Sequence, residues 1–265
     1  REVVQIYCKK PCLELSNPAR ELAAYKKTKL LSPGESEILN IKIDLNSLCS
    51  YDDGGVTGHR SCYVLLPGVY EIFGGTDIRS TEKIFEFKND ELKELIKLSE
   101  ISAPVKPFDR LTAEFKDGSY KEVYKPTPLK TTDTLKIISD NRPKNLEFTG
   151  DKGIKLIDVK TNKNSLDEFV SQLSADTMRR LIVGEGMNSP KVTDGTGAAF
   201  GGLDFELASL GIPTCCVTDG PSGLRIEDGS KATLIPNGTL FASSFNDKLT
   251  EEIFTLLGAE AYRYN

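Results

Sequence analysis

Residues 62–73, CYVLLPGVYEIF, decide the first part of the fold. Segments 62–66 and 69–73 have the length and the apolar alternation of half-buried β-strands. Between them Pro67 presets φ and Gly68 tolerates a positive φ, which suits a type II turn between antiparallel strands. The stretch therefore predicts antiparallel β-structure.

The same pattern extends to both sides of this stretch. Residues 2–8, 38–45 and 83–87 also alternate, and residues 33–34 are a second Pro-Gly turn. We therefore expect residues 1–88 to form an all-β sandwich of the immunoglobulin type. Because such a sandwich has about seven strands and roughly five or six can be recognised, we expect the first one or two to precede residue 1.

Residues 89–163 have a different composition, rich in Lys, Thr, Asp and Pro. Their prolines break any long helix, so we expect a connector. Short apolar alternations at 111–115 and 135–138 indicate that this connector lies against a domain surface and is not free coil.

Helical signals begin at residue 164. Ser165 and Glu168 form a capping-box pattern, Ser174 can cap a second helix, and Asn246 precedes a long amphipathic segment. Before that segment, residues 211–220 hold an apolar run of strand length bounded by turn residues, which suits a parallel strand buried on both faces. A buried strand, a loop and a helix in this order make one β/α unit, so residues 164–265 are expected to be an α/β domain.

Asp219 and Arg225 are the candidate site residues. They lie in VTDGPSGLR, residues 217–225, directly after the predicted strand, where α/β barrels place ligand-binding loops. A carboxylate and a guanidinium on one loop can both face a polyhydroxylated ring. The alternative is a plain Asp-Gly turn in which Arg225 pairs with Glu227 or Asp228 at the surface.

The glycine-rich residues 184–202 match no phosphate-binding motif and follow a helix, so we interpret them as a flexible loop at the rim of a site. His59 is the single histidine, so no Ser-His-Asp or Cys-His arrangement can form without it. We expect His59 to lie in a solvated loop.

Charge and cysteine content exclude several classes of partner. The net charge is -5, which argues against nucleic acid, and the apolar runs are too short to span a membrane. We expect six reduced, buried cysteines, no metal site, no cofactor and a cytoplasmic protein. The six are Cys8, Cys12, Cys49, Cys62, Cys215 and Cys216.

Two sets of motifs resemble family 3 glycoside hydrolases, the β-glucosidase family. LSPGESEILNIKIDLNSLCSYDD with YVLLPGVYEIFGGTDIRS resembles the family's fibronectin type III-like domain. LDEFVSQLSADTMRRLIVGEGMNSPKVTDGTGAAFGG and the residues from 211 onward resemble the start of its catalytic (β/α) barrel. The implied fold is a sandwich over residues 1–88, a linker over 89–163 and an incomplete TIM-type barrel portion over 164–265, in the reversed domain order of some bacterial members.

The resemblance implies a retaining exo-acting β-glycosidase that acts on small oligosaccharides or glycosides. Asp219 and Arg225 match sugar-binding residues of the family. The nucleophilic aspartate is expected after Asn265 and the acid/base glutamate before Arg1, so this chain should lack turnover without the remaining barrel and an α/β sandwich domain. The alternative is a non-catalytic carbohydrate-binding or interaction fragment, although the chain has no Trp.

Overall fold

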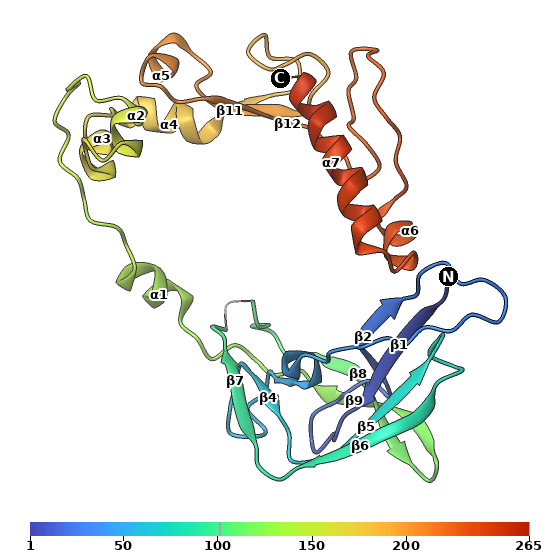
Figure 1. Cartoon of the computed structure of the whole chain (residues 1–265). Coiled ribbons are helices and arrows are strands. Elements are labelled where there is room, and N and C mark those ends of the chain that lie inside the picture. The colour runs from blue at the N-terminus through green and yellow to red at the C-terminus, as the bar shows by residue number, and fades with distance from the viewer. Residues whose placement is uncertain (101, 265) are drawn as a thin grey trace. The chain divides into compact units, whose positions relative to one another are not determined.

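A computed structural model describes residues 1–100 and 102–264 (Figure 1). The chain divides into two compact units, residues 1–142 and 143–265. The division lies inside the segment expected to be a connector, away from the boundaries expected at residues 88 and 163. Each unit is described by itself.

The first unit contains two antiparallel sheets of the sandwich. One sheet has the order β2-β1-β5-β6 and the other β3-β4-β7. Ile6 of β1, Leu65 of β4 and Ile72 of β5 share one buried cluster, so both sheets contribute to the core. The strands are β1 (Val3–Lys9), β2 (Glu21–Lys27), β3 (Ser50–Asp52), β4 (Cys62–Leu65), β5 (Gly68–Gly75), β6 (Glu82–Asn89) and β7 (Lys93–Lys97).

The Pro67-Gly68 turn does not close a hairpin, because β4 and β5 belong to different sheets. Gly68 has φ 132°, and the Tyr70 hydroxyl donates to the Leu66 carbonyl at 3.0 Å. Asn89 Nδ2 donates to the same carbonyl at 2.8 Å. A tyrosine that bonds back to the chain a few residues upstream, at a corner between sheets, is typical of immunoglobulin-like sandwiches.

Two expectations about strands need correction. The strand predicted over residues 38–45 is wrong: residues 38–44 form no ladder and lead into a 3₁₀ turn, Leu45–Leu48. Ile38 is 93% exposed, whereas Ile41 and Ile43 pack against the core, so their alternation reflects burial of one side without strand pairing. Conversely β7, inside the predicted connector, pairs with β4, so the strands of these two sheets extend to Lys97, past the boundary expected at residue 88.

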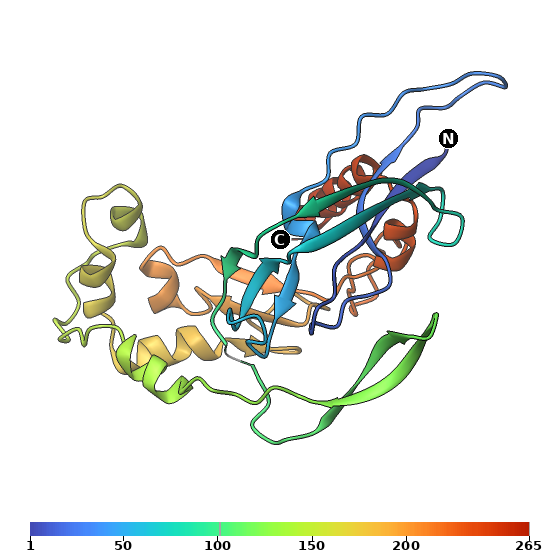
Figure 2. The same cartoon turned by 90° about the horizontal axis from the view of Figure 1, so that it is seen from below.

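A two-stranded ribbon follows the sandwich strands in the first unit (Figure 2). It consists of β8 (Asp109–Lys116) and β9 (Ser119–Pro126), paired antiparallel, and a short helix, α1 (Thr134–Asp140), comes after it. The Thr112 hydroxyl donates to the Ser16 hydroxyl at 2.5 Å, and Arg110 Nη2 donates to Asp53 Oδ1 at 3.3 Å. These contacts hold the ribbon against the loops of the sandwich.

The second unit begins with a helical cluster. Phe169, Leu173 and Leu210 are buried together, with Met178 and Ile212 packed against them. The capping box of Ser165 and Glu168 and the cap at Ser174 are confirmed. The helices are α2 (Leu156–Lys160), α3 (Leu166–Ser171), α4 (Ala175–Val183) and α5 (Phe205–Ser209).

A small antiparallel sheet completes this unit, with the order β10-β11-β12. The expectation of a parallel strand buried on both faces is wrong for β12: it pairs antiparallel with β11, and Val217 is 47% exposed. An apolar run of residues does not determine whether a strand pairs parallel or antiparallel, or which elements cover its two faces. Phe241 of α6 packs on Phe254 of α7 with ring centroids 5.5 Å apart. The elements are β10 (Glu185–Gly186), β11 (Ala198–Gly201), β12 (Thr214–Val217), α6 (Gly238–Ser243) and α7 (Asp247–Arg263), whose cap at Asn246 is confirmed.

Candidate functional site

The loop after β12 is held by its own backbone. The Arg225 N–H donates to the Asp219 carbonyl at 2.9 Å, and the Thr218 hydroxyl donates to the Arg225 carbonyl. The two candidate residues therefore stand at the two ends of one closed loop. A third bond, from the Ile235 N–H to the Ser222 carbonyl at 2.9 Å, ties the loop to the next segment.

Gly223 allows this second segment to approach. Its φ is 115°, and a Cβ atom there would lie 2.1 Å from the Thr233 carbonyl oxygen. A side chain at this position would therefore push residues 233–235 away from the loop. The sequence alone did not reveal this role, because it depends on a residue ten positions downstream.

The side chains of Asp219 and Arg225 point into solvent and lie near each other. They are 78% and 63% exposed, and Arg225 Nη1 is 3.5 Å from Asp219 Oδ2. Arg225 Nη2 also contacts Glu227 Oε1, so the surface pairing considered as the alternative is present as well. The structure brings a carboxylate and a guanidinium together on the loop, with Glu227 as a second carboxylate on the guanidinium.

The glycine-rich residues 184–202 use several of their glycines for close backbone contact. A Cβ atom on Gly195 would lie 2.6 Å from the Asp228 backbone nitrogen, and the Gly195 carbonyl accepts from the Glu227 N–H at 2.9 Å. On Gly202 a Cβ atom would lie 2.1 Å from the Ile212 carbonyl oxygen. The segment includes β10 and β11, and the Gly197 N–H donates to the Val217 carbonyl at the start of the candidate loop. Glycine here therefore allows close approach between backbone segments of the same unit.

A cavity of about 420 Å³ lies beside the base of the loop. Its lining includes Thr193, Cys216, Leu224 and Tyr262, and it carries hydroxyls and apolar groups but no carboxylate or ammonium. Hydrolysis of a glycosidic bond with retention needs two carboxyl groups about 5–5.5 Å apart. None of the residues that line this cavity supplies such a carboxyl group.

Arg180 is the centre of a cluster of ion pairs in this unit. Arg180 of α4 contacts Asp204 and Glu206, which begin α5, and its Nε donates to Asp176 Oδ2 at 3.0 Å. The carboxylates of Glu206 and Asp204 raise the pKa of the guanidinium further above its usual range. This cluster fastens α4 to α5.

The prediction of reduced, buried cysteines is confirmed in part. All six cysteines are free, but Cys12 and Cys215 are exposed, which corrects the expectation that all are buried. His59 is a half-exposed loop residue whose Nδ1 lies 2.8 Å from Glu94 Oε2. Across residues 1–100 and 102–264, no group of three His, Cys, Asp or Glu side chains could hold a metal ion, and no helix is long and apolar enough to cross a membrane.

The chain is similar to several known proteins. Residues 2–78 match the fibronectin type III-like domain family. A β-glucosidase of Ruminococcus albus is 44% identical over 260 residues, covering 98% of this chain and 27% of the relative. The chain is homologous to a segment of β-glucosidases.

Two further β-glucosidases agree with this. β-Glucosidase A of Butyrivibrio fibrisolvens is 29% identical over 291 residues, covering 100% of this chain and 33% of the relative. The crystal structure of a β-glucosidase from Paenibacillus barengoltzii superimposes with a TM-score of 0.91 at 44% identity, covering 99% of this chain and 29% of that chain. The resemblance to β-glucosidases is confirmed, and the chain spans 27% of the length of the Ruminococcus albus relative.

Proposed function

We propose that this segment belongs to a retaining exo-acting β-glycosidase that removes terminal β-linked sugars from oligosaccharides or glycosides. The similarity to β-glucosidases over 98% of the chain supports this most directly. In this proposal residues 164–265 open a TIM-type barrel, residues upstream form the sandwich and its linker, and the enzyme acts in the cytoplasm without a cofactor. The six free cysteines agree with a reducing compartment.

Within that enzyme, Asp219 and Arg225 bind the terminal sugar. The loop closed by the Arg225 to Asp219 backbone bond presents both side chains on its surface, 3.5 Å apart. The carboxylate can accept from two hydroxyls while the guanidinium donates to a third. The catalytic nucleophile and acid/base are supplied by parts of the protein outside residues 1–265, together with the rest of the barrel and an α/β sandwich domain.

The test uses the whole enzyme with aryl β-glycosides as substrates. We expect Asp219→Asn to lower kcat/KM by roughly 10- to 100-fold, because a charged hydrogen bond to the sugar is lost. Asp228→Asn is the matched control: Asp228 lies three residues after Arg225, its carboxylate accepts from the Ser230 N–H, and its variant should keep wild-type activity. Absence of sugar release by the wild type, or equal effects of the two variants, would refute the proposal.

A further inference from the structure

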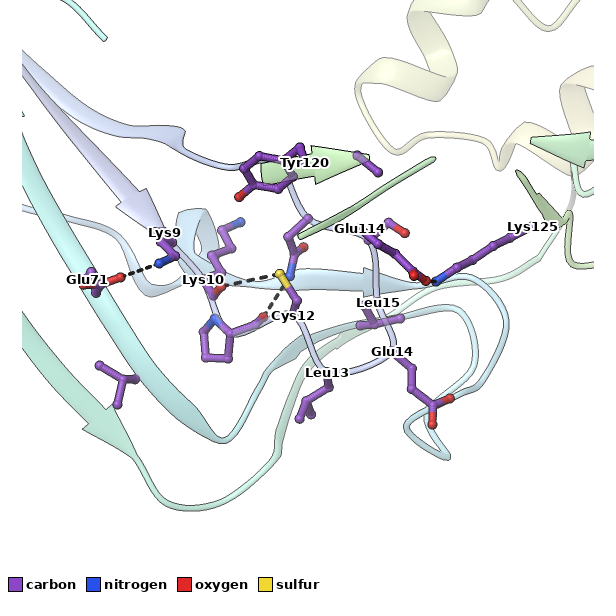
Figure 3. Close-up of a pocket in the computed structure, with 15 residues that line it drawn as sticks. Lys9, Lys10, Cys12, Leu13, Glu14, Leu15, Glu71, Glu114, Tyr120 and Lys125 are labelled. Atoms are coloured by element: carbon purple, nitrogen blue, oxygen red, sulfur yellow. Dashed lines mark hydrogen bonds and ion pairs between the residues drawn. The ribbon is translucent and has the colours of Figure 1, made fainter. Parts of the chain in front are cut away.

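A groove of about 580 Å³ lies in the first unit between residues 10–17 and the β8–β9 ribbon (Figure 3). Its volume is within the range of about 300–1,000 Å³ typical of small-molecule sites. The bond between Thr112 and Ser16 fixes the ribbon against the loop that forms the opposite wall. Both walls belong to one compact unit, so the groove is a feature of that unit alone.

The charges that line the groove are mostly paired with one another. Lys9 Nζ lies 2.8 Å from Glu71 Oε2, and Lys125 Nζ lies 2.7 Å from Glu114 Oε1. Lys10 is buried and donates to the Cys49 carbonyl at 2.6 Å. An ionic ligand would have to break these pairs, whereas a neutral ligand with hydroxyls can bond to them without separating the charges.

The groove also has exposed apolar surface, beside the polar side chains of Glu14, Ser16 and Asn17. Tyr120 of β9 is 48% exposed and Leu13 is 62% exposed, on opposite walls of the groove. Leu13 also has φ 43°, in the left-handed region that a leucine rarely adopts. Neither burial nor backbone preference explains an exposed leucine in this conformation, and such outliers cluster at ligand-binding sites.

We propose that this groove binds a neutral oligosaccharide or polysaccharide chain. A pyranose ring has an apolar face, which suits Tyr120 and Leu13, and a rim of hydroxyls, which suits the Lys–Glu pairs. The groove is lined by residues of the first unit, whereas the Asp219 loop belongs to the second, and binding in the groove does not require that the protein hydrolyse anything.

The 265-residue chain can be tested by affinity electrophoresis in gels that contain barley β-glucan, xylan or polygalacturonate. We expect retardation by at least one of the two neutral polymers and none by the polyanion. Tyr120→Ala should weaken binding by roughly three- to tenfold, the range for loss of one stacking contact. Tyr124→Ala is the control, since Tyr124 is 68% exposed on the same strand but does not line the groove.

Migration unaffected by both neutral polymers, or equal losses in Tyr120→Ala and Tyr124→Ala, would overturn the proposal. Leu13→Gly separates ligand contact from a structural role, because glycine accepts the left-handed backbone and should leave the melting temperature unchanged. Its retardation should fall with the fold intact. Full retardation of Leu13→Gly would contradict the role assigned to this wall.

Discussion

At the scale of single residues, Tyr70 closes the corner between the two sheets. It has no solvent exposure, and its hydroxyl donates to the Leu66 carbonyl. We expect Tyr70→Phe to reduce the free energy of unfolding by about 1 kcal/mol, the usual contribution of one buried hydrogen bond. Urea unfolding measures the loss, and Tyr63→Phe, at a residue 39% exposed, should change little. Equal effects would mean that the corner bond contributes nothing.

The same tyrosine makes the stability of the sandwich depend on pH in the alkaline range. Burial raises the pKa of Tyr70 from 10.0 to about 12. Because the fold favours the neutral phenol, its contribution is complete below pH 10 and is lost as the pH rises from 10 to about 12. Tyr70→Phe should therefore remove part of the decline in stability over that range. An unchanged alkaline decline in the variant would contradict this assignment.

Glu100 makes the stability of the first unit depend on pH in the acid range. Burial would raise its pKa, but the N–H groups of Thr131 and Thr132 and the Arg60 guanidinium outweigh burial and lower the pKa to about 2. The carboxylate is thus the form that the fold favours, so its contribution is complete above about pH 4.5 and is lost as the pH falls toward 2.

Glu100→Gln should therefore lower the melting temperature at pH 7 and flatten its dependence on pH between about 4.5 and 2. Thermal unfolding followed by circular dichroism across this range checks both effects. Glu122→Gln, on the exposed face of β9, is the control and should behave as the wild type. A variant whose melting temperature declines as steeply as that of the wild type would refute the role of Glu100.

At the scale of elements, the site loop depends on Gly223. We expect Gly223→Ala to cost roughly 2–4 kcal/mol, because the added Cβ meets the Thr233 carbonyl oxygen and the residue keeps φ 115°. Gly229→Ala separates the two causes: Gly229 has φ 91° with open space around it, so its variant should cost only about 1 kcal/mol. Similar costs for both variants in urea unfolding would show that the close approach does not matter.

Elements whose signal is local could be predicted from the sequence. The Ser165–Glu168 box sets the start of α3 by bonds within four residues, and strand β1 follows from its own alternation. Strand β7 was missed because all five of its residues are exposed, so no periodic burial marks it. The direction of β12 depends on β11, which the residues of β12 do not encode.

In the candidate site, too, some features could be predicted from the sequence and others could not. The presence of Asp219 and Arg225 on one loop follows from their spacing, and a contact between Arg225 and Glu227 was foreseen as an alternative. The support from Gly195 and Gly223 could not be foreseen, because it consists of contacts with residues 228 and 233 that only the folded chain brings near. The sequence therefore predicted which side chains lie on the loop, but the backbone contacts that support the loop form only in the folded chain.

At the scale of the whole molecule, the two units have separate cores. Ile6 and Tyr70 belong to a cluster in the first unit, whereas Phe169 and Leu210 belong to one in the second. Units with their own cores can unfold separately, so differential scanning calorimetry should resolve two transitions. Two variants, one in each unit, assign them.

Tyr70→Phe should lower only the transition of the first unit, by a few degrees. Gln172→Leu should lower only the other, because the buried Gln172 amide accepts from the Lys152 and Ile154 N–H groups at 3.1 Å and donates to the Ile154 carbonyl at 2.7 Å. Three backbone groups would lose their partner, which costs about 2–3 kcal/mol. If either variant shifted both transitions equally, the units would be unfolding as one, and their separate cores would not act as separate cooperative structures.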